Sequence, residues 1–402
     1  MASPPISVLH FSNSVVRGGA EEHILTLLNN LDRRWFRLHL VATPEVAELV
    51  RADLPADVEL IPLKLRKPSD FAAALRLAGI IRERQVKVLH SHLFYSSVFA
   101  SPIGWLCRVP VIIETPHVRE QWRTGRIKSR FVVDRAVGCF VDGYIAVSEA
   151  NRRYLVESKR LPARKITVVH NGVDLRRFDP ARRAPSGLKP SLGFGEGDPT
   201  LVSVGRLEPQ KGHSVLIAAM ARVRSRFPQG RLVLVGEGSL RSALADQARA
   251  LGLERAVRFA GYQANVADWL ALADVTVLPS LYEGLPIVAI ESLAAGRPMV
   301  ATAVDGTPEV IVDGKTGLTV PPRDPVKLAE AIGRLLGDSE LARQLAAAGR
   351  RWVADHFSQD LQVSQTQLVY LRALKASGCS VNLTGLAENT VPDERHGARR
   401  LV

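Results

Sequence analysis

The sequence predicts an α/β protein with two doubly wound parallel-sheet domains, and three observations lead to this class. Short apolar runs typical of buried strands alternate with helical patterns along most of the chain, as in βαβ units. The alternation stops once, in a Pro- and Gly-rich stretch at residues 179–199, and then restarts. The length of 402 residues is long for one core and suits two domains.

The first strand is expected at residues 6–12, and the first helix at 20–31 has apolar residues at helical spacing. Further strands are expected at 37–42, 86–90, 111–115 and 143–147. These elements define an N-terminal domain at residues 1–178. Residues 179–199 are expected to be a linker between the two domains.

The C-terminal domain is expected at residues 200–359, with strands at 200–204, 231–235, 257–260, 275–278 and 299–302. Residues 376–402 are polar and aperiodic, so we expect a disordered tail there. Ligands of doubly wound sheets bind at the carboxyl ends of the strands. Two such sheets that face each other predict a site in the cleft between the domains.

The formal net charge is +13, of which residues 1–180 carry +9 and residues 181–402 carry +4. A basic domain suits nucleic acid, an anionic membrane or a phosphorylated substrate. The arginines are mostly isolated and no zinc-finger or helix-turn-helix pattern occurs, so we do not expect nucleic acid. Three scattered cysteines, no signal peptide and no long apolar run favour a cytoplasmic protein without a structural metal.

The segment "GRLEPQKG" at residues 205–212 follows a predicted strand and precedes a predicted helix. Gly205 allows a tight turn, and Arg206 and Lys211 place two cations beside the positive end of the helix. A phosphate or diphosphate fits this arrangement. A solvated loop with exposed charges explains the same residues equally well.

A second glycine-rich turn, "VGEGSL" at residues 235–240, contains Gly236 and Gly238 and also follows a strand. It is typical of a backbone that approaches a nucleotide. The pattern alone is weak, because a plain strand-to-helix turn has the same composition.

The segment "YEGLPIVAIE" has a carboxylate near each end of an apolar run. A helix is expected from about Pro286 to Ala295, which places Glu283 in the preceding loop and Glu291 within the helix. Buried carboxylates need polar partners, and sugar hydroxyls are suitable donors. The alternative is that Glu283 caps the helix and Glu291 forms a salt bridge.

In the N-terminal half, Gly18 and Gly19 lie at the start of the first predicted helix, where backbone amides favour a phosphate or sugar. A tight turn without a ligand explains them too. His117 follows the strand at 111–115, so its position at a carboxyl end makes a functional and a structural role equally plausible. For His90 and His92 we favour a structural role.

Together these segments resemble the retaining glycosyltransferases of family 4, which have the GT-B fold. The resemblance extends to about residue 375. Its most specific parts are "GGAEEHILTLL" at 18–28, "GRLEPQKG" at 205–212, "VGEGSL" at 235–240 and the Glu283–Glu291 pair. "VSE" at 147–149, "HNGVD" at 170–174 and the segment 305–325 are also similar to the family. His170 stands where many relatives have proline, and we expect this difference to be neutral.

The resemblance implies roles for these residues. Arg206 and Lys211 would hold the donor diphosphate and Glu291 the donor ribose. Glu283 would lie near the donor sugar. His117 would contact the transferred sugar. The remaining residues that the resemblance places at the donor are Gly205, Gly236, Gly238, Leu240, Gly284 and Leu285, and those on the acceptor and phosphate side are Gly18, Gly19 and Glu21.

The implied reaction moves a sugar from a nucleotide-diphosphate donor, UDP before GDP, to a saccharide or lipid-linked acceptor held by the N-terminal domain. Retention of configuration is usually assigned to front-face attack, with the leaving phosphate as base, so we do not cast Glu283 as a nucleophile. We expect neither a metal nor another cofactor. The helix at 360–375 would cross back onto the first domain and complete it.

Many relatives act at the cytoplasmic membrane face. The run 119–130 has five basic residues with Trp122 and Ile127, which suits peripheral contact with anionic lipid; a solvated helix face is the alternative. Rival functions are a nucleotide-sugar epimerase or a phosphorylase on the same fold. A non-enzymatic module that binds lipid or nucleic acid ranks last, because it leaves the paired cations and carboxylates unexplained.

Overall fold

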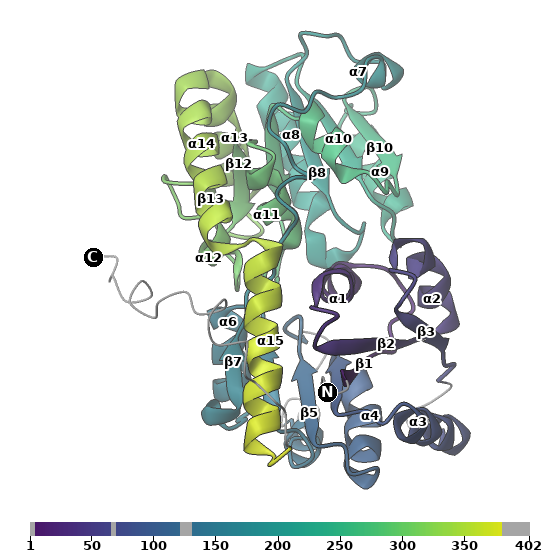
Figure 1. The fold of residues 1–402 in the computed structure, drawn as a ribbon. Helices are drawn as coiled ribbons and strands as arrows, with labels where there is room; N and C mark the ends of the chain where they lie inside the picture. Colours follow the sequence, from purple (N-terminus) through teal and green to yellow (C-terminus); the bar gives the residue numbers. More distant parts are fainter. Residues whose placement is uncertain (1–4, 66–69, 121–130, 380–402) are drawn as a thin grey trace.

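A computed structural model describes residues 5–65, 70–120 and 131–379. The chain forms two lobes, and Figure 1 shows the N-terminal domain below and the C-terminal domain above. Each lobe contains one parallel sheet, of seven strands in the first and six in the second. The predicted class of two doubly wound α/β domains is therefore confirmed.

The N-terminal sheet has the strand order β3-β2-β1-β4-β5-β6-β7, and all its strand pairs are parallel. The strands are β1 (Ile6–Ser12), β2 (Phe36–Ala42), β3 (Glu59–Pro62), β4 (Val88–His92), β5 (Val111–Thr115), β6 (Gly143–Ala146) and β7 (Ile166–Val168). Both faces of β1 are buried: Val8 contributes to one apolar core and its neighbour Leu9 to the other. Burial on both faces explains why these strands are continuous apolar runs.

Two layers of helices cover this sheet. Helices α1 (Gly19–Asn30), α2 (Pro44–Val50) and α15 (Gln359–Ala376) contribute to the core on one face. Helices α3 (Phe71–Glu83), α4 (Phe94–Leu106) and α5 (Val132–Val137) contribute to the core on the other. A short helix, α6 (Glu149–Arg153), follows β6.

The C-terminal sheet has the order β10-β9-β8-β11-β12-β13. Its strands are β8 (Thr200–Val204), β9 (Arg231–Val235), β10 (Val257–Gly261), β11 (Val275–Leu278), β12 (Met299–Thr302) and β13 (Leu318–Val320). Its helices are α8 (His213–Arg226), α9 (Arg241–Ala250), α10 (Val266–Leu272), α11 (Ile287–Ala294), α12 (Thr307–Val310), α13 (Pro325–Gly337) and α14 (Ser339–His356).

Both sheets share one topology: the first strand of each domain lies inside, the second and third lie on one side of it, and the fourth lies on the other. Successive strands are first added on one side of this strand and then on the other, so the order switches beside it. Such a switch point leaves a crevice at the carboxyl ends of the strands, where doubly wound proteins bind ligands. The loops after β1, β4, β8 and β11 are therefore the places to look for a site.

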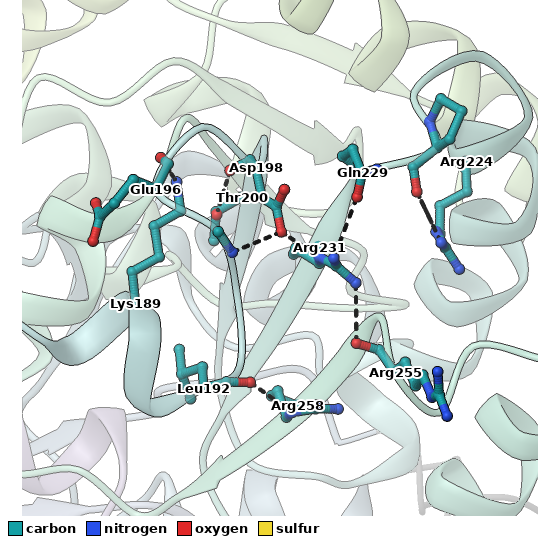
Figure 2. Close-up of polar contacts among 12 residues, drawn as sticks. Lys189, Leu192, Glu196, Asp198, Thr200, Arg224, Gln229, Arg231, Arg255 and Arg258 are labelled. Carbon is teal, nitrogen blue, oxygen red and sulfur yellow. Dashed lines mark hydrogen bonds and ion pairs between the residues drawn. The ribbon is translucent and has the colours of Figure 1, made fainter.

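The stretch expected as a linker is partly integrated into the C-terminal domain. It contains the short helix α7 (Leu188–Ser191), and Phe194 is buried against Val202 and Val233 of the sheet. Figure 2 shows the polar contacts around it: Asp198 pairs with Arg231 at 2.7 Å, and Arg258 donates to the Leu192 carbonyl. One aromatic side chain among Pro and Gly has no periodicity, so the sequence pattern could not reveal this packing.

Helix α15 returns from the C-terminal domain and packs along the N-terminal domain (Figure 1). The crossing point is held by backbone bonds, because Val173 donates to the Phe357 carbonyl and Gln359 donates to the Val173 carbonyl, both at 3.0 Å. Of the expected tail at 376–402, residues 380–402 lie outside the described residues. Within the described part of the chain, no helix is both long and apolar enough to cross a bilayer.

Candidate active site between the two domains

Lys211 and Glu283 form an ion pair at the carboxyl edge of the C-terminal sheet. The Lys211 ammonium lies 2.6 Å from Glu283 Oε1, and the side chains are 16% and 7% exposed. The Ser280 hydroxyl donates to the same oxygen at 2.6 Å, and the Glu283 backbone N–H donates to Asp305 Oδ2 at 2.9 Å. Residues of three loops, after β8, β11 and β12, therefore meet at Glu283.

Arg206 is exposed at the start of the same loop. Its guanidinium donates to Gln210 Oε1 at 3.2 Å, while the Gln210 amide donates to the Tyr282 carbonyl at 3.0 Å. The backbone closes the connection, because Leu281 donates to the Gln210 carbonyl at 2.7 Å. The segment 205–212 is thus tied to the segment 280–283, and both cations lie on the same side of the domain.

The glycine-rich turn after β9 packs on this loop. Gly236 has φ +138°, and a Cβ there would lie 2.1 Å from the Gly205 carbonyl oxygen. Only glycine permits this approach. Further on, the Leu240 N–H donates to the Leu207 carbonyl at 2.9 Å, and Gly238 lies against the same residue. The structure therefore brings the two glycine-rich segments together.

Glu291 lies on α11 with a partly buried side chain. Among the described residues its carboxylate makes no hydrogen bond and no ion pair. Burial raises the pKa of Glu291 to about 7; the Arg177 charge lowers it and the Glu22 charge raises it further. A carboxylate with an elevated pKa and no bonded partner is typical of a ligand site. Among the described residues, the salt bridge that was the alternative explanation of Glu291 is not formed.

The loop that carries Glu283 contacts the N-terminal domain directly. A Cβ at Gly284 would lie 1.8 Å from the His117 carbonyl oxygen, so glycine is required for this approach. The Ser148 hydroxyl donates to the Gly284 carbonyl at 3.0 Å. Asn171 donates to the carbonyl of Leu285 at 3.2 Å. The loop that carries Glu283 and the N-terminal domain are therefore in direct contact.

His117 follows β5 and its ring is half-buried. Its Nε2 lies 3.1 Å from His92 Nδ1, and the His23 ring lies edge-on with centroids 4.8 Å apart. Burial lowers the pKa of His117 well below its ordinary value. The imidazole is therefore neutral near pH 7 and offers a hydrogen bond to a ligand rather than a charge.

The first helix of the N-terminal domain faces α11. A Cβ at Gly19 would lie 3.7 Å from Ile287 Cδ1, which places the start of α1 opposite the start of α11. Glu21 has a structural partner: its Oε2 accepts the Gly18 N–H at 2.9 Å and so caps the helix. The carboxylate of Glu21 therefore fixes the backbone of Gly18.

Several residues that lie at the site were not predicted as site residues. Ser280 and Asp305 hold Glu283, and Asp305 has a left-handed backbone at φ +41°. Arg119 of the N-terminal domain lies 4.0 Å from Asp305 Oδ1. Asp305 begins the segment that resembles the family, which was the one available signal for it. Ser280 has none, since its spacing to Glu283 is common in loops.

His170, which replaces a frequent proline, contributes to the domain contact. Its Nε2 lies 3.0 Å from Glu309 Oε2, and the Glu309 carboxylate also accepts the backbone N–H groups of Glu149 and Ala150 at the start of α6. The substitution was expected to be neutral. The structure shows that it adds a polar contact between the two domains.

Two facing doubly wound sheets, with a paired lysine and glutamate at the junction, define a protein of the nucleotide-sugar transferase class. Residues 17–177 match the family described as Glycosyltransferase Family 4, and residues 187–352 match Glycosyl transferases group 1. The chain therefore belongs to the family 4 glycosyltransferases, which have the GT-B fold, and it is a glycosyltransferase that uses a nucleotide-sugar donor.

Individual relatives agree with this assignment. The chain is 32% identical over 332 residues to a glycogen synthase of Mycobacterium tuberculosis, covering 80% of this chain and 78% of that protein. It is 30% identical over 424 residues to the D-inositol 3-phosphate glycosyltransferase of Salinispora arenicola, covering 92% and 91%. The structure of Anabaena HepE in complex with UDP and glucose has a TM-score of 0.79 at 20% identity, covering 91% of this chain and 100% of that chain.

Proposed function

We propose that the protein transfers a hexosyl group from a UDP-sugar to a hydroxyl of a saccharide or lipid-linked acceptor, with retention of anomeric configuration. A GDP-sugar is the second choice of donor. One observation carries the proposal. Arg206, Lys211 and Glu283 lie together on two connected loops, and the residue after Glu283 contacts His117 of the other domain. The HepE complex with UDP and glucose supports the donor, and the named relatives support a sugar acceptor.

Arg206 and Lys211 would bind the donor diphosphate and stabilise the charge that develops on it as the glycosidic bond breaks. Lys211 has three N–H donors, and its contact with Glu283 occupies one of them. The pair thus positions the ammonium while other donors remain for phosphate oxygens. Among the described residues, the Arg206 guanidinium donates a hydrogen bond to the neutral Gln210 side chain and forms no salt bridge, so it retains donors for an anion.

Glu291 would bind the ribose. Its carboxylate has acceptor positions that no described residue fills, and two vicinal hydroxyls would supply the missing donors. The ionised carboxylate would accept hydrogen bonds from both hydroxyls. Because burial raises the pKa of Glu291 to about 7, ribose binding would depend on pH near neutrality. The Gly284–Leu285 backbone would face the sugar from the same loop.

Retention by front-face attack is compatible with the state of Glu283. Its Oε1 already accepts from both Lys211 and Ser280, which makes it a poor nucleophile. The leaving phosphate would accept the proton of the acceptor hydroxyl. We further propose that the transfer requires no metal, since two side-chain cations supply the charge.

The acceptor would be bound by the N-terminal domain, and the surface of that domain favours an amphipathic one. Among the described residues, ten exposed large apolar side chains belong to this domain and three to the other. Val15 and Val16 lie beside the glycine loop, and Val132 and Val133 lie on α5, near Arg135. Apolar side chains on a basic domain suit the surface of an anionic bilayer. Most of the run 119–130, expected to make this contact, lies outside the described residues.

Sedimentation with vesicles tests the membrane contact. The protein should bind vesicles that contain phosphatidylglycerol and not vesicles of phosphatidylcholine alone. Val132→Glu with Val133→Glu should weaken binding, whereas Tyr262→Glu, at an exposed apolar position of the other domain, should not. Equal binding by all three proteins would contradict a lipid-facing N-terminal domain.

A thermal-shift panel of UDP, GDP, ADP and their sugars tests the donor. A ligand at 100 times its Kd stabilises a protein by about 2.7 kcal/mol, which is readily measured. The proposal expects the largest shift with UDP compounds. The anomeric configuration of the product, read by NMR, then tests retention.

A nucleotide-sugar epimerase or a phosphorylase remains the alternative. Incubation of the donor without an acceptor separates the first, because an epimerase converts the donor sugar alone. A phosphorylase would require inorganic phosphate. Turnover that depends on a saccharide or lipid-linked acceptor, and not on phosphate, supports the transferase.

A further inference from the structure

Five histidine side chains form a contiguous group beneath the N-terminal side of the site. They come from β1, α1, β4 and the loop after β5, and are His10, His23, His90, His92 and His117. The rings of neighbouring members lie 4.1 to 5.6 Å apart. Sugar transfer gives a role to His117 alone, so the other four need a separate explanation.

Three of these side chains converge on one point. His23, His92 and His117 each offer one ring nitrogen, and the three nitrogens lie within 4.8 Å of one another. The closest pair, His92 Nδ1 and His117 Nε2, is 3.1 Å apart. Zinc–imidazole bonds are about 2.0–2.1 Å long, so two ligands of a tetrahedral ion lie roughly 3.3 Å apart. The 3.1 Å pair already has this spacing, and the third nitrogen, within 4.8 Å of the others, would have to move inward to complete the set.

The opposite nitrogens of two rings already have partners. His92 Nε2 lies 3.0 Å from His10 Nδ1. His23 Nδ1 lies 2.9 Å from Asn171 Oδ1 and 2.9 Å from Gln362 Nε2. When His23 donates to Asn171, its Nε2 lone pair is left for the convergence point. Outer partners of this kind orient histidines that bind metals.

His23 Nε2 is an independent observation. The atom is buried, in a residue that is only 1% exposed, and it has no hydrogen-bond partner among the described residues. A buried polar atom without a partner destabilises the fold unless something satisfies it. A bound cation at the convergence point would do so.

The chemistry of the ligands selects the kind of ion. All three are imidazoles, which bind metals in their neutral form. No carboxylate is among the three ligands, so borderline ions such as Zn²⁺, Cu²⁺ or Ni²⁺ fit better than Mg²⁺ or Ca²⁺.

We propose that His23, His92 and His117 form a binding site for one Zn²⁺-like transition-metal ion, and that the bound ion blocks the active site. Metal binding itself does not depend on the proposed transfer reaction. The blocking does, because it assumes that His117 contacts the transferred sugar. The half-buried ring of His117 gives the ion access from the site.

Cobalt titration tests the binding. Chelator-treated full-length protein without a polyhistidine tag is titrated with Co²⁺, and the visible absorption reports the ligands. We expect saturation at one ion per chain, with bands of tetrahedral nitrogen coordination, no thiolate charge-transfer absorption and displacement by Zn²⁺. The thiolate criterion excludes the three free cysteines Cys107, Cys139 and Cys379.

Variants locate the ion. His23→Gln and His117→Gln should each weaken Co²⁺ binding at least about tenfold, in line with the sensitivity of metal sites to single changes. His356→Gln removes an exposed histidine of the other domain and should have no effect. His90→Gln should also retain binding, because both His90 nitrogens are engaged, by Tyr370 and by Thr115. Thermal melts identify any variant that fails to fold.

The proposal is overturned if no saturable binding occurs, or if folded His23→Gln and His117→Gln bind as wild type. Loss of binding in folded His90→Gln would equally overturn it, by placing the ion elsewhere in the group. The group would then be a hydrogen-bonded chain of imidazoles. With UDP-glucose as donor, Zn²⁺ should lower the transfer rate at least tenfold; unchanged transfer with the ion bound would refute the blocking alone.

Discussion

At the scale of single residues, the Lys211–Glu283 pair is a largely buried contact that lies where the proposed function places the donor. Burying two charges is costly unless further hydrogen bonds satisfy them, and here the Ser280 hydroxyl donates to the Glu283 carboxylate, while Asp305 accepts the backbone N–H of Glu283 and holds its loop. Such a pair contributes little net stability compared with apolar residues of the same size. Its presence at a junction of three loops is better explained by the chemistry of the site.

Lys211→Ala should abolish transfer while the fold persists. Loss of one fixed donor to a developing negative charge typically lowers kcat by about 10²–10³. Initial rates with saturating donor measure the effect, and circular dichroism checks the fold. Lys327→Ala, at an exposed lysine paired with Glu330, is the matched control and should leave both unchanged. A folded Lys211→Ala protein with near-normal transfer would disprove the diphosphate role.

The raised pKa of Glu291 predicts that nucleotide binding depends on pH. With a pKa of about 7, roughly one tenth of the free protein carries an ionised Glu291 at pH 6 and roughly nine tenths at pH 8. If ribose requires the carboxylate, the apparent Kd should fall about tenfold as the pH rises over this range.

Calorimetry with UDP at both pH values measures this change. Glu291→Gln is the control, because it removes the carboxylate and retains the dependence that comes from the diphosphate itself. The variant should bind more weakly at pH 8 and show a flatter profile. Identical profiles for both proteins would remove Glu291 from the nucleotide site.

At the scale of elements, the site depends on how closely the Glu283 loop approaches the loop after β5. Gly284 sets this distance, since a Cβ would overlap the His117 carbonyl. The hydrogen bonds from Ser148 and Asn171 then fix the loop on both sides of the glycine. The loop therefore takes part in the contact between the domains as well as in the proposed donor site.

Gly284→Ala should separate the domains slightly and weaken transfer. Overpacking of this kind costs about 1–3 kcal/mol, because the backbone oxygen it meets must move. Thermal melts and kcat/KM measure the two effects. Gly197→Ala is the control, since a Cβ there meets nothing within 4 Å. A Gly284→Ala protein with the melting temperature and activity of the wild type would show that the observed approach is not required.

The elements that carry the site were largely predictable, because strongly apolar strands and helical spacing are local signals. The strand at 299–302 was expected with its observed bounds, and the helix expected from Pro286 begins one residue later at Ile287. The strands β3, β7 and β13 were not expected. Each has only three or four residues, and β3 is exposed at residue 59, so none has a clear pattern.

The contacts across the site were less predictable than its elements. Glycine-rich loops and the two cations could be recognised from local composition and from the resemblance to the family. The pairing of Lys211 with Glu283 joins residues 72 positions apart, and the approach of Gly284 to His117 joins two domains. Spacing along the chain contains no information on such contacts. The grouping of the five histidines was not predicted for the same reason, since its members come from four separate segments.

At the scale of the whole molecule, α15 couples the two halves of the chain. It follows the last helix of the C-terminal domain and contributes Val363, Tyr370, Leu371 and Leu374 to a core of the N-terminal domain. The Tyr370 hydroxyl lies 2.6 Å from His90 Nδ1, deep in that core. The N-terminal domain is therefore complete only when the C-terminal end of the chain has folded onto it.

Tyr370→Phe should destabilise the N-terminal domain. The change leaves His90 Nδ1 without its partner in a buried site, which costs about 1–3 kcal/mol. For a domain of this size, the melting temperature should fall by roughly 2–4 °C for each kcal/mol. Tyr262→Phe removes an exposed hydroxyl and should leave the melt unchanged. If both variants had the same melting temperature, the hydroxyl of Tyr370 would add no stability.

The central claim is that the leaving diphosphate is neutralised by the two cations after β8. A crystal structure of the protein soaked with UDP or GDP tests it most directly. The account predicts phosphate oxygens within hydrogen-bond distance of Lys211 Nζ and the Arg206 guanidinium, with the ribose on Glu291. A nucleotide bound elsewhere, with both cations facing solvent, would contradict it.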